Sequence, residues 1–211
     1  MNKRKWIQFF VLGFFLVGLP AVSWYYLKTG FDYQKRSVSE LQILGTVFRI
    51  EGLLPDGSVW TNQQTREKLG VMHLLDCSAY TEENPLVDRM NRLHRQFADR
   101  EDVLIITFLY NCALNNSFDK ISALFNQDIN QVKGRQLVIL SDDAKLKFEK
   151  DALKIGSFQD EKDIILFDNK GMIRNIYQSS SPEQFKRLVE HIAILMPRDQ
   201  EDIHLRRERE K

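Results

Sequence analysis

The pattern of apolar and polar residues begins with a long apolar segment at the N-terminus. Residues 6–27 contain no charged side chain. At a rise of about 1.5 Å per residue, a helix over these residues crosses a hydrocarbon core of about 30 Å. We therefore predict a transmembrane helix over residues 6–27, with a basic cap at residues 1–5 and a polar tether at residues 28–46.

The flanks of this segment predict that it is an uncleaved anchor and give its orientation. Trp24, Tyr25, Tyr26 and Lys28 follow the apolar run, as in an interfacial aromatic belt with a snorkelling lysine, and no small-residue cleavage site is apparent. Basic residues of the cap precede the span, so the positive-inside rule places the N-terminus in the cytoplasm. We expect a single-pass protein of the bacterial inner membrane whose C-terminal domain is periplasmic.

The remaining chain alternates apolar runs with amphipathic segments, which predicts one α/β domain over residues 47–197. The expected elements are a hairpin around a Pro-Asp-Gly turn (47–60), a strand (71–75), a helix (85–97), a strand (103–109), a helix capped by Ser117, a strand (137–140), a short helix (144–152), a hairpin (163–177) and a final helix from Ser181. The apolar run 103–109 is typical of a central strand buried on both faces. This order predicts a thioredoxin-like fold, followed by a charged tail at residues 198–211.

Composition and the absence of known motifs argue against several classes of function. The 30 basic and 29 acidic residues leave a net charge of +1, which argues against a nucleic-acid partner. Two cysteines, Cys77 and Cys112, are too few for a disulfide-rich scaffold and lack zinc-site spacing. The sequence shows no serine–histidine–acid arrangement, P-loop or GxGxxG motif. Chemistry, if present, therefore depends on the cysteines.

Cys77 is the first candidate because it follows the strand at residues 71–75 and precedes a predicted helix. Side chains after a buried parallel strand gather at the carboxyl edge of the sheet, where α/β proteins place their sites. A helix N-terminus close to Cys77 would also favour its thiolate form. Asp76 could accept the thiol proton, but its negative charge would also raise the thiol pKa.

At this point residues 47–196 resemble the SCO/SenC family of membrane-anchored, thioredoxin-fold proteins. The resemblance is carried by the N-terminal anchor, the first hairpin, the strand–Cys–helix at 71–97, the strand and helix at 103–125, and ILFDNKGMIRNIY, which is similar to the LIDPDG hairpin of that family. It implies a role in assembling the copper centre of cytochrome oxidase.

The resemblance also implies a copper site that this chain does not reproduce. In the family, both cysteines of a CxxxC motif and a later histidine hold copper. Cys77 matches the first cysteine, but Thr81 stands at the second position, and the histidine position falls near Asp160. A hydroxyl cannot replace a soft thiolate for Cu(I). We therefore expect a non-catalytic assembly factor or accessory subunit of a respiratory oxidase, such as cytochrome oxidase, or of another inner-membrane complex, without a cofactor.

Cys112 keeps an alternative open. It follows the predicted strand 103–109, and neighbouring parallel strands end side by side, so Cys77 and Cys112 could form a disulfide or a two-thiol metal site, with Asp160 as a further candidate ligand. The alternative function is then a periplasmic thiol-redox or copper-delivery protein. The simpler interpretation is two small buried apolar residues. A peroxiredoxin-like peroxidase is disfavoured because no hydroxyl residue shortly precedes Cys77.

The histidines and the paired aspartates have structural interpretations. His73 alternates faces within its strand, which predicts a hydrogen-bonded residue on a sheet face. His94 lies between Arg92 and Arg95 and is expected on a solvated helix face. The pair Asp142–Asp143 is expected to form a turn or to cap a helix rather than to bind a metal.

Overall fold

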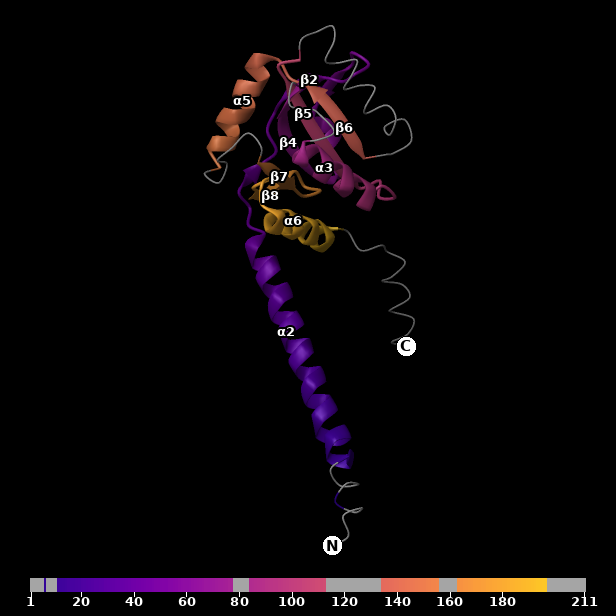
Figure 1. The fold of residues 1–211 in the computed structure, drawn as a ribbon. Helices are drawn as coiled ribbons and strands as arrows, with labels where there is room; N and C mark the ends of the chain where they lie inside the picture. The colour runs from indigo at the N-terminus through magenta and orange to yellow at the C-terminus, as the bar shows by residue number, and fades with distance from the viewer. Residues whose placement is uncertain (1–5, 7–10, 78–83, 113–133, 156–162, 197–211) are drawn as a thin grey trace, which may run out of the picture. The chain divides into compact units, whose positions relative to one another are not determined.

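The computed structural model describes residues 6, 11–77, 84–112, 134–155 and 163–196 (Figure 1). The chain divides into two compact units, Met1–Glu40 and Leu41–Lys211.

Several predicted features fall on residues that the structure does not describe. The basic cap, Thr81, the helix starting at Ser117, Asp160 and the tail at residues 198–211 lie outside the described residues.

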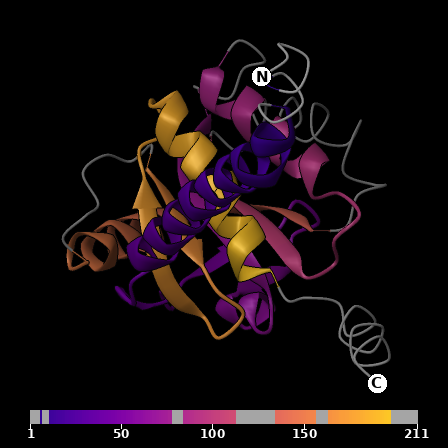
Figure 2. The same cartoon turned by 90° about the horizontal axis from the view of Figure 1, so that it is seen from below.

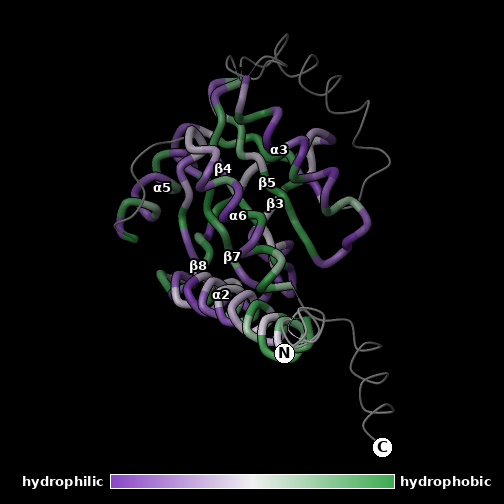
Figure 3. The backbone as a smooth tube through the Cα atoms, turned by 60° about the horizontal axis from the view of Figure 1, so that its bottom comes forward, coloured by the Kyte–Doolittle hydropathy of each residue, from purple (hydrophilic) through white to green (hydrophobic). Residues whose placement is uncertain are grey.

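The described residues of the first unit are helical. A π-helical turn, η1 (Phe14–Gly18), leads into α2 (Leu19–Glu40). Among the described residues, one helix, Val11–Glu40, is long and apolar enough to cross a membrane. Figure 3 shows apolar residues toward its N-terminal end and more polar ones toward its C-terminal end. The helix continues to Glu40, through residues where the sequence predicts a tether.

The π-helical turn adjoins a proline. The amide of Leu19 donates to the carbonyl of Phe14, five positions earlier. Pro20, next along the chain, has no amide hydrogen to continue the ladder. Such π turns are a recognised cause of local helix distortion, so this feature needs no functional explanation.

The described strands of the second unit form one eight-stranded mixed sheet in the order β1-β8-β7-β4-β5-β6-β2-β3. Their bounds are β1 Gly45–Thr46, β2 Glu51–Leu53, β3 Val59–Thr61, β4 Leu69–Asp76, β5 Val103–Tyr110, β6 Arg135–Ile139, β7 Ile164–Phe167 and β8 Met172–Tyr177. Strands β4, β5 and β6 are parallel to one another, whereas the flanking pairs are antiparallel. The predicted central position of the strand at 103–109 is confirmed.

Among the described residues, three helices cover the sheet: α3 (Pro85–Gln96), α5 (Asp142–Leu153) and α6 (Pro182–Leu195). Each begins at a side-chain cap, because Asn84, Ser141 and Ser181 accept hydrogen bonds from backbone amides in the first turn. The cap of α5 is Ser141, and Asp142 and Asp143 lie in the first helical turn rather than at the cap position that the sequence predicts. Figure 2 shows α6 lying across the strands.

Two hydrophobic cores lie on opposite faces of the sheet. Alternate residues of β4, such as Val71 and Leu75, pack with side chains of α3 and α6, whereas Met72 and Leu74 pack with Phe148 of α5. Because both faces are covered, β4 and β5 are buried almost throughout.

The N-terminal hairpin is shifted along the chain from its predicted position. Strand β2 pairs with β3 around a turn in which Gly57 has φ +82°. The predicted first strand, residues 47–50, is not extended in the sheet; instead Phe48 and Ile50 are buried in the core beside α5. Buried and exposed residues alternate along this segment, so its sequence has the alternation of apolar and polar residues that is typical of a strand.

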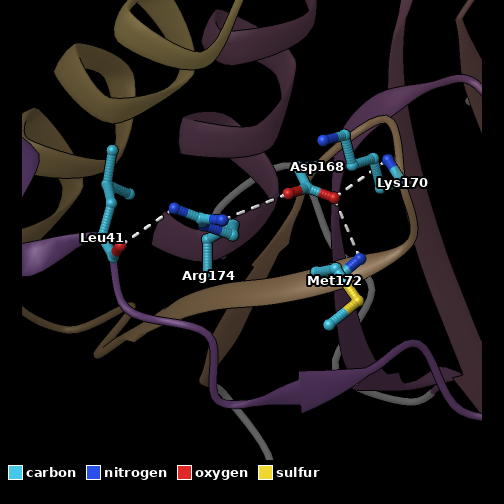
Figure 4. A network of polar contacts seen from close by, with 5 residues as sticks. All are labelled: Leu41, Asp168, Lys170, Met172 and Arg174. Carbon is cyan, nitrogen blue, oxygen red and sulfur yellow. Dashed lines mark hydrogen bonds and ion pairs between the residues drawn. The ribbon is translucent and has the colours of Figure 1, made fainter.

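The closing hairpin is fixed by a carboxylate (Figure 4). One oxygen of Asp168 accepts hydrogen bonds from the amides of Lys170 and Met172, at 2.9 and 3.0 Å. The other lies 3.4 Å from Arg174, which also donates to the carbonyl of Leu41 at 3.0 Å. This network ties the β7–β8 turn to the start of the domain.

Candidate functional site

The structure joins Cys77 and Cys112 by a disulfide at the carboxyl ends of β4 and β5. Asp76 at the end of β4 pairs with Tyr110 at the end of β5, so the two cysteines follow neighbouring parallel strands. Their Cα atoms are 5.2 Å apart, within the range of about 4.4–6.8 Å that a disulfide requires. The structure therefore has the disulfide that the sequence left open, rather than two free thiols.

The two half-cystines differ in exposure. Cys77 is 4% exposed and belongs to the core cluster beneath α3 and α6. Cys112 is only partly buried and packs against the edge of that cluster. An incoming thiolate would therefore reach the sulfur of Cys112 more easily than that of Cys77, and Cys77 would be the leaving group.

A polar bridge spans the same two strand ends. The side-chain amide of Asn111 donates a hydrogen bond of 2.8 Å to a carboxylate oxygen of Asp76. Asn111 also adopts a left-handed backbone with φ +54°, which asparagine tolerates better than most residues. This residue directly follows β5 and precedes Cys112. Sequence reasoning missed Asn111, although an asparagine directly after a strand was an available signal.

Asp76 would influence the cysteines once the disulfide is reduced. Its carboxylate belongs to the residue directly before Cys77, and a neighbouring negative charge disfavours formation of a thiolate there. The sequence predicts that a helix N-terminus close to Cys77 favours its thiolate. The described helix α3 begins only at Pro85, so its N-terminus does not directly follow Cys77. Residues 78–83 lie outside the described part of the chain.

His73 is a buried structural residue, as predicted. It is 1% exposed, and its Nε2 atom lies 2.9 Å from the hydroxyl of Thr107 on β5. Burial, together with the positive charge of Arg135, lowers the pKa of His73 to about 4. The imidazole is therefore neutral at physiological pH.

The prediction for His94 was wrong. Its side chain is 5% exposed, although the neighbouring Arg92 and Arg95 are exposed. His94 lies four positions after Met90 on α3, and this spacing returns it to the buried stripe of the helix. The local charge pattern therefore misidentified its face.

The described donors do not fit the copper site of the SCO family. No group of three or more histidine, cysteine, aspartate or glutamate side chains that could hold a metal occurs among the described residues. The sulfurs of Cys77 and Cys112 are joined to each other and offer no thiolate. The further candidate Asp160 lies outside the described residues.

Comparisons with known proteins give a fold. No family model matches the chain. No curated protein matches it by sequence. Among solved structures, it is similar to a SCO1/SenC family lipoprotein from Bacillus anthracis, with a TM-score of 0.57, 16% identity, and coverage of 72% of this chain and 96% of that one.

Two other solved structures support the same fold. BsSco is a member of the Sco family of cytochrome c oxidase assembly proteins in which a disulfide switch has been identified; it has a TM-score of 0.56 and 14% identity, with 72% of this chain and 93% of that chain covered. The thioredoxin domain of a thiol-disulfide oxidoreductase from Bacteroides vulgatus has a TM-score of 0.51 and 15% identity, with 74% and 99% covered. The second unit thus has the thioredoxin-like fold found in SCO/SenC proteins, as the sequence predicted.

Proposed function

We propose that this chain is a membrane-anchored, SCO-like thiol–disulfide exchange protein whose working pair is Cys77 and Cys112. The observation that carries this proposal is the disulfide across the carboxyl edge of the two central parallel strands, with the partly exposed Cys112 at its outer side. The carboxyl edge of such a sheet is where α/β folds place reactive groups.

The exchange follows from the exposure of the two sulfurs. A client thiolate attacks the sulfur of Cys112, the bond between the two cysteines breaks, and its electron pair leaves on Cys77 as a thiolate. A second client thiol, deprotonated by solvent, then displaces Cys112 from the mixed disulfide. The client is oxidised to a disulfide, and this protein takes up two electrons and two protons. The reverse sequence reduces a client disulfide.

The proposed location is the periplasmic side of a bacterial inner membrane. The helix Val11–Glu40 is long enough to anchor the chain, with residues 6–27 in the bilayer, and the basic cap favours a cytoplasmic N-terminus. The periplasm is an oxidising compartment in which a disulfide persists. The client is accordingly a membrane complex or another periplasmic protein.

A second candidate is a non-catalytic assembly factor or accessory subunit of a respiratory oxidase, such as cytochrome oxidase, or of another membrane complex. The burial of Cys77 favours it, because a buried disulfide that resists reduction has a structural role. In this case the domain serves as a docking module, and the disulfide only holds β4 to β5.

Thiol reactivity of the full chain in mild detergent separates these candidates. After reduction, the Cys77→Ser variant retains the outer thiol and should react rapidly with an aromatic disulfide reagent, whereas Cys112→Ser retains the buried thiol and should react slowly. A redox titration of the wild type against glutathione gives the potential. A potential below about −300 mV, together with no exchange with a dithiol peptide, would overturn the exchange function.

Copper delivery is tested on the same material. Reduced wild-type protein is titrated with Cu(I), and the Cys77→Ser variant serves as the control. Tight stoichiometric binding that disappears in the variant would support copper delivery by the cysteine pair. Co-purification of oxidase subunits with the full chain, from cells where both cysteines are replaced, would support the accessory-subunit candidate.

A further inference from the structure

A basic pocket lies at the opposite end of the sheet from the disulfide. Its volume is about 870 Å³. The pocket is lined by the β7–β8 turn at Lys170, and Phe167 at the end of β7 pairs with Gly70 at the start of β4. The disulfide follows the other end of β4. The pocket is therefore separate from the thiol site.

The walls of the pocket carry a local excess of positive charge. The charged side chains that line it are Arg49, Arg66, Lys147, Lys154 and Lys170 against Glu67 and Asp151. Lys154 pairs with Asp151 at 2.7 Å. Within the described part of the chain, the other four cations form no ion pair. Since the whole chain is only +1, this excess is a feature of the pocket.

The pocket also has an apolar part. Phe48, Val47 and Ile155 line it, and the ring of Phe48 packs edge-on against Phe148 at 5.2 Å between centroids. Phe48 is 7% exposed and Phe148 is fully buried, so this wall is held by the core. A ligand that fits such walls combines an apolar body with an anionic group.

Hydrogen bonds hold the remaining walls in place. Asp168 binds the amides of Lys170 and Met172 within the β7–β8 turn (Figure 4), and the amide of Val47 donates to the carbonyl of Gly171 at 2.8 Å. A pocket whose walls are fixed before binding loses little entropy when a ligand enters.

We propose that this pocket binds a small phosphate ester that carries an apolar group. Two arginines and up to three lysines match a doubly charged phosphate better than a single carboxylate, because guanidinium groups bind phosphate oxygens in pairs. The phosphate can belong to a soluble ester or to a lipid headgroup. This inference stands apart from the thiol chemistry, since the two sites lie at opposite ends of β4.

Calorimetric titration of the full chain in a neutral detergent tests the proposal, with phenyl phosphate and inorganic phosphate as probes. Phenyl phosphate should bind saturably and more tightly than inorganic phosphate. The Lys147→Glu variant should lose about tenfold or more in affinity, which corresponds to one charge-assisted hydrogen bond. Lys150→Glu is the matched control, because Lys150 is an exposed residue of the same helix that does not line the pocket.

A second variant fills the pocket without changing its charge. A Cβ atom added at Gly45, which lines the pocket, has no atom within 4 Å, so Gly45→Leu should fold and weaken phenyl phosphate binding. Absence of saturable binding by the wild type, or equal losses in Lys147→Glu and Lys150→Glu, would overturn the proposal. Binding should persist when both cysteines are replaced, so failure here is distinct from failure of the exchange function.

Phenyl phosphate binding measured in nanodiscs distinguishes a lipid headgroup from a soluble phosphate ester. If phosphatidic acid in the disc, whose headgroup is a phosphate monoester, weakens phenyl phosphate binding relative to a pure phosphatidylcholine disc, and Lys147→Glu removes this competition, the pocket takes a lipid headgroup. Unchanged binding in both discs identifies a soluble phosphate ester as the ligand class.

Discussion

Removal of the Cys77–Cys112 disulfide should destabilise the domain by about 4 kcal/mol. The two cysteines are 35 positions apart, and the loop between them contains α3 and β5. Closing a loop of this length removes about 13 cal/mol/K of entropy from the unfolded chain, which is about 4 kcal/mol at 25 °C. The native state should change little in the double variant Cys77→Ala/Cys112→Ala, because alanine fits the space left by a small buried side chain.

Thermal unfolding of the full chain in detergent, followed by circular dichroism, measures this effect. For a domain of this size, roughly 2–4 °C of melting temperature corresponds to 1 kcal/mol, so the double variant should melt roughly 8–16 °C below the oxidised wild type. Wild-type protein treated with reductant should melt close to the double variant. This second sample controls for any packing defect that alanine introduces.

The same stabilisation bears on redox function. By the thermodynamic cycle, about 4 kcal/mol of preference for the disulfide places its potential roughly 85 mV below that of the same pair in the unfolded chain. A melting difference of less than about 3 °C between oxidised and reduced wild type would refute the loop-closure reasoning. It would mean either that the reduced domain gains compensating contacts or that its unfolded state is already compact.

Three further predictions concern single residues. In chemical denaturation, the Asn111→Ala variant should lose about 1–2 kcal/mol more stability than Asn111→Gly. Both variants lose the hydrogen bond to Asp76, but only glycine keeps the left-handed backbone without strain. Equal losses of stability in the two variants would contradict this reasoning. The pKa of His73 is about 4 in the folded protein, against an ordinary value of 6.5, so between these pH values the unfolded chain binds a proton that the folded protein does not. The free energy of unfolding should therefore fall by roughly 3 kcal/mol as the pH is lowered from 6.5 toward 4. The His73→Gln variant should show a smaller dependence of stability on pH over this range. Gly70→Ala should destabilise by about 3 kcal/mol, since its Cβ would collide with the carbonyl oxygen of Leu104, whereas Gly45→Ala in open space should change the melting temperature little.

The sequence by itself determined the type and order of most described elements. Periodicity distinguishes β4, β5 and the helices because a strand repeats every two residues and a helix every 3.6. Ser181 and the turn at Gly57 were readable because caps and left-handed turns demand particular residue types. The long apolar helix at the N-terminal end was readable for a similar reason, since its pattern is a continuous run of uncharged residues.

Prediction from the local sequence pattern was wrong where two different structures have the same pattern of apolar and polar residues. Residues 47–50 alternate in burial without joining the sheet, and His94 is buried although charged residues flank it. The polar stretch after the apolar segment is helical to Glu40, because polar residues without proline tolerate a helix as well as a tether.

The site was only half predictable. The sequence placed Cys77 and Cys112 after neighbouring strands, but whether their sulfurs meet depends on the parallel register of β4 with β5 and on the left-handed turn at Asn111. The basic pocket had no sequence signal, because its cations come from segments far apart in the chain, from Arg49 to Lys170. Local periods fix which face a residue takes, whereas only strand order and register decide which distant residues become neighbours.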